Sequence, residues 1–305
     1  MLPYMVSRLV RGVFTVFGVV VIIFLLTRAS GDPAKTLQGD SNDPARYAQI
    51  RKDLGLDDPL LTQFGNYLSN VARGDFGESW NYHRPAIDVV KERVPASAKL
   101  AAAGLMISVF LGVPLGVIAA VRRGSPIDAL ARGVGLIGQS IPTFWVGIML
   151  ILIFSVQLGL LPSSGTGGWQ HLVMPAIAVG WFSTASILRL TRSAMLDVLD
   201  TEYIRMARIK GISGFTLIRR HALRNAAIPV VTIAGLQLAA LLTGAVVTEA
   251  IFAWPGIGSL VVSAANGRDF PMVQTVALLT ATTFVVVNVL VDMLYGYIDP
   301  RIWSR

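Results

Sequence analysis

Residues 133–188 decide the fold; they read GVGLIGQSIPTFWVGIMLILIFSVQLGLLPSSGTGGWQHLVMPAIAVGWFSTASIL and contain no Asp, Glu, Lys or Arg in 56 positions. A helix that crosses the hydrocarbon core of a bilayer needs about 20 apolar residues. The stretch is therefore too long for one crossing and long enough for two. It divides within residues 159–168, where the letters LPSSGTGG have the composition of a turn.

Further uncharged stretches have the length of a membrane span. The first, residues 12–27, is bounded by Arg11 and Arg28, whose long side chains can reach the two membrane surfaces. Its apolar run exceeds that of a usual signal peptide and no A-x-A-like site follows it, so we expect no cleavage. The sequence predicts an all-α polytopic membrane protein with six transmembrane helices, near residues 9–29, 98–121, 133–157, 172–194, 227–250 and 272–295.

The composition agrees with a membrane protein and argues against other classes. Hydrophobic residues make up 53% of the 305 residues, charged residues only 14%, and the mean hydropathy is +0.62, whereas a typical soluble domain is about 25% charged. The absence of cysteine excludes a disulfide-stapled secreted fold and thiolate chemistry. The three histidines are scattered without ligand spacing, so no metal site is expected.

Lysine and arginine are distributed unevenly among the segments between the spans. With the N-terminus inside, the inner segments hold 15 basic and 6 acidic residues, and the outer segments hold 11 basic and 12 acidic ones. Basic residues favour the cytoplasmic side of short loops, so we expect both termini and residues 195–226 in the cytoplasm. This bias accounts for the net charge of +8 without nucleic acid as a partner.

The outer segment 30–97 carries helix signals. Asp43-Pro44 is typical of an N-cap followed by proline at the first helical position, and Gly55 is expected to end that helix. Asp58-Pro59 repeats the signal before a second helix. An apolar face of that helix predicts either a lid on the outer ends of the spans or a dock for an external partner; it comprises Leu60, Leu61, Phe64, Tyr67, Leu68 and Val71.

The inner segment 195–226 predicts two short helices that meet at Gly211. Asp200 or Thr201 can cap the first helix and Ser213 the second. Eight basic residues lie between Arg189 and Arg224. A loop needed only for membrane topology requires neither caps nor apolar faces, so this segment is expected to form a rigid elbow.

The inner segment resembles the cytoplasmic EAA loop of permease subunits from bacterial dipeptide/oligopeptide ABC importers, in the binding-protein-dependent type I family. The resemblance extends over nearly the whole chain, because further motifs follow in order on the predicted spans and loops. The motifs are YIRMARIKG at 203–211 with HALRNAAIP at 221–229, GDP at 31–33, LGLDDP at 54–59, GDFG at 74–77, TEAIF at 248–252, WPGIG at 254–258, DFP at 269–271 and DPR at 299–301.

This resemblance implies the type I ABC importer permease fold in the bacterial cytoplasmic (inner) membrane. The implied domains are an N-terminal transmembrane helix at 1–29, a helical extracytoplasmic loop at 30–97, an ABC transmembrane type-1 domain at 98–296 and a cytoplasmic tail at 297–305. The third of these contains five helices and the EAA loop at about 197–226.

The implied function is that of the membrane-spanning subunit of an ATP-binding cassette importer, which forms the pathway for dipeptides or oligopeptides. The implied partners are a second homologous permease subunit in a heterodimer, two ATPase subunits, an extracytoplasmic substrate-binding protein and the lipid bilayer. The chain itself is then not an enzyme and holds no cofactor, since ATP and Mg are used by the ATPases. Related subunits serve importers of nickel, glutathione or oligosaccharides, and these remain alternatives.

In this family a coupling helix in the EAA loop fits a cleft on the ATPase. Arg205 stands where many importers have a glutamate, so here the position is expected to meet a carboxylate rather than an arginine. The resemblance places these residues at or near the ATPase: Tyr203, Arg205, Ala207, Gly211, Ile212 and Ser213.

The residues themselves place ATP hydrolysis in another chain. A Walker A loop needs Gly-Lys-Ser/Thr so that backbone N–H groups cradle phosphate, and none of the five lysines follows a glycine. A serine protease is disfavoured, although Gly211-Ile-Ser213-Gly has a G-x-S-G pattern, because no histidine lies centrally in a span.

A secondary transporter is the main alternative. Such proteins usually hold ionisable groups deep within spans, whereas here Glu249, Asp292, Arg189 and Arg192 lie near predicted span ends. Polar side chains within the spans are candidates for a substrate pathway, or for hydrogen bonds between helices. They are Gln139, Ser140, Gln237, Thr243 and Asn288.

Overall fold

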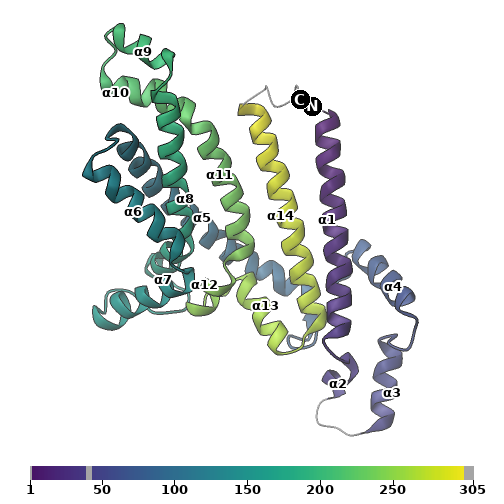
Figure 1. The fold of residues 1–305 in the computed structure, drawn as a ribbon. Coiled ribbons are helices and arrows are strands. Elements are labelled where there is room, and N and C mark those ends of the chain that lie inside the picture. Colours follow the sequence, from purple (N-terminus) through teal and green to yellow (C-terminus); the bar gives the residue numbers. More distant parts are fainter. Residues whose placement is uncertain (1, 39–42, 299–305) are drawn as a thin grey trace.

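The computed structural model describes residues 2–38 and 43–298. Within these ranges, five helices are long and apolar enough to cross a membrane, and a bent helix pair makes a sixth span if its two halves count as one. Figure 1 shows the long helices standing side by side. They are α1 (Leu2–Ala29), α5 (Ala86–Val121), α8 (Trp169–Leu199), α11 (Leu223–Gly244) and α14 (Phe270–Ile298).

The predicted span 133–157 is not a straight helix. The chain forms α6 (Pro126–Ser140), α7 (Thr143–Leu150) and the π-helical segment η1 (Ile151–Gln157), with a bend of 101° between α6 and the α7–η1 unit. Pro142 causes the break, because proline disfavours helical backbone at the residue before it; Ile141 is extended, with φ −84° and ψ 125°. The six-span arrangement therefore depends on a bent third span.

Small residues bring α5 and α8 into close contact. A Cβ on Gly104 would lie 2.6 Å from the Val179 side chain, and one on Gly116 would lie 2.6 Å from the Leu188 carbonyl oxygen. Between them, the Ser108 hydroxyl donates to the Gly180 carbonyl at 2.9 Å. Membrane helices associate through such small residues because van der Waals contact, rather than water exclusion, drives their pairing.

The predicted span 227–250 is divided. The helix α11 ends at Gly244, and α12 (Val246–Ile251) and α13 (Ile257–Asn266) follow at the end of the bundle opposite the start of α1 (Figure 1). The carboxylate of Glu249, which is 1% exposed, accepts a hydrogen bond from the backbone N–H of Ser259 at 3.0 Å. Glu249 thus caps the first turn of α13 instead of extending to the membrane surface.

The segment between α1 and α5 is helical, as expected. It contains α2 (Pro33–Gln38), α3 (Pro44–Asp53), α4 (Leu60–Ala72) and a small hairpin of β1 (Glu78–Ser79) with β2 (Arg84–Pro85). The cap by Asp43 is confirmed, since its side chain accepts from the Ala45 N–H at 2.9 Å. The predicted cap at Asp58 is wrong: Pro59 precedes the helix and no side chain caps it.

The apolar face of α4 packs only partly on α1. The Phe64 ring lies 5.2 Å from the Phe24 ring, and Tyr67 stacks on Phe24 at 5.9 Å. Leu61 remains 85% exposed. The lid expectation therefore holds for one part of the face, and the start of α4 projects away from the spans.

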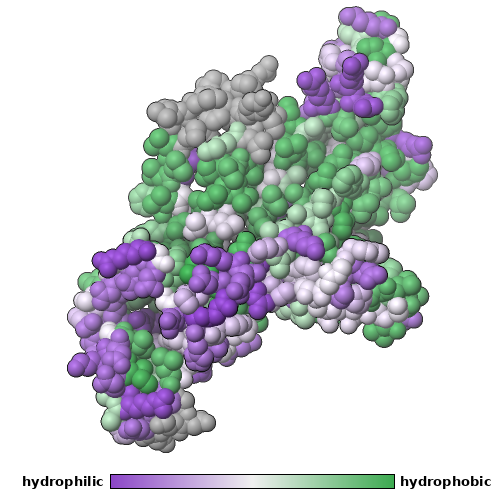
Figure 2. All heavy atoms as spheres, turned by 180° about the vertical axis from the view of Figure 1, so that it is seen from behind, coloured by the Kyte–Doolittle hydropathy of each residue, from purple (hydrophilic) through white to green (hydrophobic). Residues whose placement is uncertain are grey.

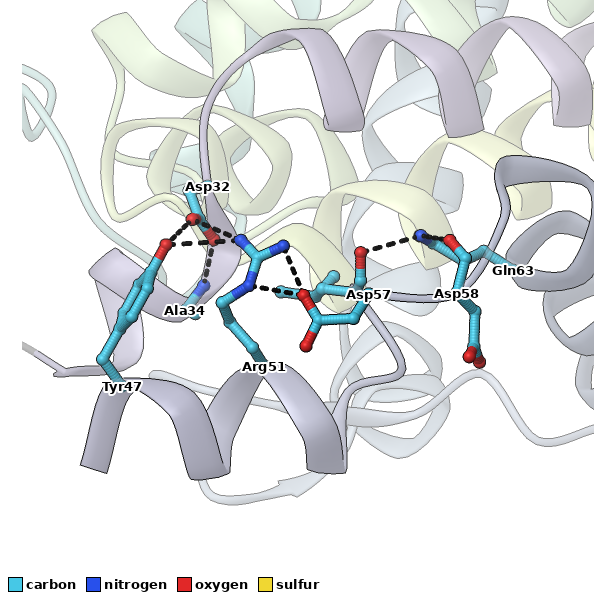
Figure 3. A network of polar contacts seen from close by, with 8 residues as sticks. Asp32, Ala34, Tyr47, Arg51, Asp57, Asp58 and Gln63 are labelled. Atoms are coloured by element: carbon cyan, nitrogen blue, oxygen red, sulfur yellow. Dashed lines mark hydrogen bonds and ion pairs between the residues drawn. The ribbon is translucent and has the colours of Figure 1, made fainter. Parts of the chain in front are cut away.

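A polar network ties α2 and α3 to the start of α4 (Figure 3). Asp32 accepts hydrogen bonds from the Tyr47 hydroxyl and from Arg51 Nη1, the latter at 3.0 Å. Burial alone would raise the pKa of Asp32, but hydrogen bonds from Tyr47, the Ala34 N–H and Arg51 hold it below its ordinary value. The hydrogen bond to Asp57 raises the pKa of Arg51, so both partners of the network are stabilised in their charged forms.

Asp269 joins the hairpin to α14. It is completely buried, its Oδ1 accepts from the Met272 N–H at 3.2 Å, and its Oδ2 accepts from the Ser79 hydroxyl at 2.5 Å. The Trp80 ring packs edge-on against Phe270 beside this contact. The residues of the DFP motif therefore cap the last long helix and hold the outer segment on it.

Candidate coupling loop and pathway

The inner segment forms α9 (Glu202–Ile209), α10 (Gly214–Thr216) and the π-helical segment η2 (Leu217–Ala222), which leads into α11. Figure 1 shows these elements projecting from the end of the bundle where α1 begins and α14 ends. The opposite end carries α2 to α4, α12 and α13. Figure 2 shows a hydrophobic belt between the hydrophilic surfaces of these two ends.

The elbow at Gly211 is confirmed. Gly211 has φ +74°, a backbone conformation that glycine adopts at little cost. The N–H of Gly211 donates to the Arg208 carbonyl at 3.0 Å, and the N–H of Ile212 donates to the Ala207 carbonyl at 3.3 Å. These bonds end α9 and turn the chain toward α10 in the manner of a helix C-cap.

The inward face of the elbow packs on the ends of α5 and α8. Ile204 is completely buried and Ala207 is 5% exposed; they belong to a cluster with Met195, Leu217 and Ala222. Ile212 packs against the same cluster from its edge. The position of the loop is thus set by apolar burial, which resists rotation of α9 on the bundle.

The outward face of the elbow exposes large apolar side chains between basic ones. Ile209 is 80% exposed and Phe215 72%, and Tyr203 and Met206 are each more than half exposed. The residues that the resemblance places at the ATPase do not include Met206, Ile209 or Phe215. These residues could be found from the sequence by their helical position. If Ile204 and Ala207 face the bundle, the apolar residues on the other side of the same short helices must face outward. Such a surface fits a partner protein rather than water.

Ion pairs hold the loop and the neighbouring helices in place. Arg192 on α8 binds Asp128 on α6 through two hydrogen bonds, of 2.6 and 3.0 Å. Arg123, after α5, pairs with Asp200 at 3.3 Å. A bidentate arginine–carboxylate contact fixes orientation as well as distance, so Asp128 and Arg192 keep α6 in register with α8.

The predicted coupling residues fall into two groups. Tyr203, Arg205, Gly211 and Ser213 are exposed on the elbow, whereas Ala207 and Ile212 turn toward the bundle and support it. Arg205 forms an ion pair with Glu202, its neighbour one helical turn earlier, at 2.7 Å.

Two side-chain caps expected in this loop are absent from the structure, and the disfavoured serine–histidine pair is absent as well. Thr201 Oγ1 donates back to the Val198 carbonyl at 2.7 Å, and Ser213 Oγ donates to Thr216 Oγ1 at 2.9 Å, so neither side chain caps a helix. The hydroxyl of Tyr203, not Ser213, hydrogen-bonds to Nδ1 of His221. The G-x-S-G pattern therefore has no serine–histidine pair.

The predicted pathway residues lie on three different helices. Gln139 and Ser140 lie at the end of α6, Gln237 on α11 and Asn288 on α14. Ser140 and Asn288 donate to carbonyls one turn earlier in their own helices, at 2.9 Å each. Thr243 lies on α11, but its side chain is outside the described residues. These positions stay predictions.

No group of three or more potential metal ligands occurs within the described ranges. The membrane-spanning helices, the helical outer segment and the elbow at the opposite end define a polytopic permease subunit. Two family models match the chain: "Binding-protein-dependent transport system inner membrane component" over residues 112–304, and its N-terminal counterpart over residues 1–101. The chain belongs to this family of ABC importer permeases; it is a multi-pass protein of the inner membrane, and ATP hydrolysis resides in a separate subunit.

Individual relatives agree with this assignment. The chain is 41% identical to the glutathione transport system permease protein GsiC of Escherichia coli (strain K12), over 99% of both chains. It is similarly 41% identical to GsiC of Shigella flexneri serotype 5b, again over 99% of both chains.

Solved structures share the fold. The inward-facing MetNI methionine ABC transporter matches with a TM-score of 0.57 and 21% identity, covering 69% of this chain and 96% of that one. An amino acid ABC transporter crystallised with histidines matches with a TM-score of 0.56 and 14% identity, covering 69% and 94%. At these identities the likeness establishes the fold of the permease alone.

Proposed function

We propose that the chain is one half of a heterodimer of permease subunits that imports short peptides, including glutathione. In this proposal α9, Gly211 and α10 form the element that docks the ATPase. The observation that carries the docking role is the two-sided elbow. Its inner face is buried against Met195 and Leu217, and its outer face presents Ile209 and Phe215 to a partner. A stiff element of this kind can transmit the closure of the ATPases mechanically.

The proposed orientation puts this elbow and both termini in the cytoplasm. The segments at that end hold 15 basic residues against 6 acidic ones, as positive-inside topology requires. Cytoplasmic ATPases would then meet α9 and α10. The Arg205–Glu202 pair is exposed on the same face, and an exposed pair of this type contributes little stability by itself. Arg205 can therefore exchange Glu202 for a carboxylate on the ATPase.

The substrate proposal rests on the relatives that are named for glutathione, a tripeptide. Dipeptides and oligopeptides share its backbone, so one pathway would serve them, with selectivity left to a separate binding protein. Nickel and oligosaccharides are alternative cargoes of related importers. ATP and Mg would be bound by the partner ATPases, and this chain would hold no cofactor.

The docking proposal is tested by Gly211→Val. A Cβ at this position would meet no atom within 4 Å, but the positive φ would strain the valine by about 1–2 kcal/mol. The strain is expected to misdirect α10, to reduce co-purification of the ATPase subunits and to uncouple ATP hydrolysis from uptake. Gly165→Val is a matched control, because Gly165 has φ +86° and open space but lies at the opposite end. Normal ATPase attachment and uptake by Gly211→Val would refute the docking role.

The substrate proposal is tested by uptake into proteoliposomes that contain this chain, the second permease, the ATPases and the binding protein. We expect ATP-dependent uptake of labelled dipeptide that excess glutathione reduces and that nickel or maltotriose leaves unchanged. Competition by nickel or by the oligosaccharide instead would reassign the cargo. Uptake by this chain alone, driven by an ion gradient, would favour a secondary transporter.

A further inference from the structure

A pocket of about 250 Å³ with a mixed polar and apolar lining lies at the end of α1 that leads into α2. Its wall on one side is a stripe of α4 residues at helical spacing, Gln63, Asn66, Tyr67 and Asn70. Arg28, from the last turn of α1, lines it from the other side. Figure 1 shows α4 beside this half of α1. The remaining wall is mixed; it includes three aromatic residues, Phe76, Trp80 and Phe270, and the acidic residue Asp75.

Two polar atoms of the pocket residues are buried without a partner. Gln63 is 9% exposed. Its Nε2 donates to the Leu56 carbonyl at 3.1 Å and to the Asp58 carbonyl at 2.8 Å, and Figure 3 shows the bond to Asp58. Its Oε1 accepts nothing, and Nε of Arg28 donates to nothing. Buried polar groups nearly always have partners, so one acceptor and one donor of the pocket residues have hydrogen-bonding capacity that the described residues leave unused.

The guanidinium of Arg28 forms no ion pair within the described residues, and Asp32 attracts its charge only from beyond ion-pair distance. Its central carbon lies 5.4 Å from the centre of the Phe24 ring, a cation–π contact that leaves the charge unpaired. The carboxylate of Asp32 is occupied by Tyr47 and Arg51, and Asp75 accepts from the Gly77 N–H at 2.9 Å. A partly buried arginine in this state favours an incoming oxyanion.

We propose that this pocket receives the C-terminal residue of a short peptide, with the carboxylate beside Arg28 and a backbone N–H on Oε1 of Gln63. This inference rests on the proposed peptide cargo. The volume is below the ~300–1,000 Å³ of sites for drug-sized ligands, which suits one end of a peptide rather than a whole oligopeptide. Tyr67 and Trp80 would flank the terminal side chain.

A lipid phosphate is the competing occupant of an arginine near the membrane surface. It would satisfy the charge of Arg28 but would leave the buried acceptor of Gln63 and the three aromatic residues without a function. The combination of cation, acceptor and aromatic rings therefore favours the peptide.

The test is calorimetric titration of the full-length chain in phosphatidylcholine nanodiscs with Ala-Ala-Phe and with its C-terminal amide. We expect the amide to bind at least about tenfold more weakly, because it lacks the charge-assisted contact. Arg28→Gln should weaken binding of the free acid to the level of the amide and leave the amide unchanged. Arg46→Gln, the same change at an exposed residue of α3 outside the pocket, should bind like the wild type.

A second variant covers the case in which Arg28→Gln fails to insert. Asn66 is exposed at the pocket wall, so Asn66→Asp adds a negative charge without disturbing the fold. It should weaken binding of the free acid about tenfold but not of the amide. The proposal is overturned if the wild type binds neither peptide at millimolar concentration, if it binds both equally, or if an inserted variant at either position binds the free acid undiminished.

Phosphatidylglycerol nanodiscs separate the two occupants. Loss of peptide binding there, together with retention of that lipid by the wild type but not by Arg28→Gln in native mass spectrometry, would assign the pocket to lipid and overturn the proposal. Undiminished peptide binding would support it. Uptake is not measured in these titrations, so failed uptake with intact binding would fault the proposed transport function alone.

Discussion

The hydroxyl of Ser97 on α5 donates a 2.7 Å hydrogen bond to Oε1 of Glu249 on α12, a residue 152 positions later in the chain. The same hydroxyl oxygen accepts from the Ile257 N–H at 2.8 Å. The side chain of Ser97 thus joins the first turn of α13 to the carboxylate that caps it. Gly256 leaves room for this arrangement, since a Cβ there would lie 2.2 Å from the carboxyl group.

Replacement of the Glu249 carboxylate should destabilise the end of the bundle that carries α12 and α13. Glu249→Gln keeps the shape but weakens the charge-assisted bonds to Ser97 and Ser259, for an expected loss of about 1–3 kcal/mol. The measurement is Tm of the detergent-solubilised protein by tryptophan fluorescence. Glu78→Gln, the same change at an exposed position, should leave Tm unaltered. Equal Tm values for the two variants would contradict the role of this cap.

Contact between α5 and α8 should not tolerate a methyl group. A Cβ on Gly180 would lie 2.6 Å from the Gly104 carbonyl oxygen, so Gly180→Ala should cost about 1–3 kcal/mol through forced separation of the helices. Gly133→Ala in α6 meets no atom within 4 Å and should stabilise the helix by up to about 1 kcal/mol. Thermal unfolding of both variants tests the difference, and a stable Gly180→Ala would show that the helices can separate cheaply.

The polar network of the outer segment should withstand mild acid. Because the pKa of Asp32 is held below its ordinary value, its contribution is complete above the unfolded-state pKa of about 3.9 and disappears as the pH falls through the lower folded-state value. Limited proteolysis of the segment should therefore proceed equally at pH 5 and pH 7 and faster only below pH 4. Asp32→Asn should be cleaved faster at every pH. Faster cleavage of the wild type already at pH 5 would contradict the depressed pKa.

Cysteine labelling should distinguish the two ends, since the chain has no cysteine of its own. Ser164 and Ser213 are both exposed. A membrane-impermeant thiol reagent should label Ser164→Cys in intact cells and should label Ser213→Cys only after permeabilisation. Labelling of Ser213→Cys in intact cells would invert the proposed orientation.

Local features were predictable from the sequence because their causes are local. A glycine between two short amphipathic stretches predicted the turn at Gly211, and aspartate followed by proline predicted the cap at Asp43. The bend at Ile141 was missed although Pro142 was visible, because prolines inside membrane helices are often tolerated as mild kinks. The motif near Asp58 resembles that at Asp43, yet there the side chain turns away from the helix start.

Contacts between distant segments were not predictable from one sequence. Glu249 looked like a residue near a membrane surface, and its burial follows only once α5 supplies Ser97. The contact between Asp128 and Arg192 likewise requires α6 to lie along α8. The outward-facing side chains of the elbow became apparent only when the buried face, with Ile204 and Ala207, was located. Contacts between residues far apart in the chain leave no repeating pattern in the sequence, so they could not be predicted from it.

Direct contact along the glycines of α5 and α8 has a consequence for transport. Helices that interdigitate through Gly104, Gly116 and Gly180 leave no room for one to slide past the other. We expect α5 and α8 to move as one rigid unit, with the elbow packed on its end through Met195 and Ile204. The pair would then pivot about the breaks in the neighbouring helices at Ile141 and Ala245, where the backbone is not helical. A displacement of the elbow would reach the opposite membrane face as a rotation of the α5–α8 pair rather than as bending within it.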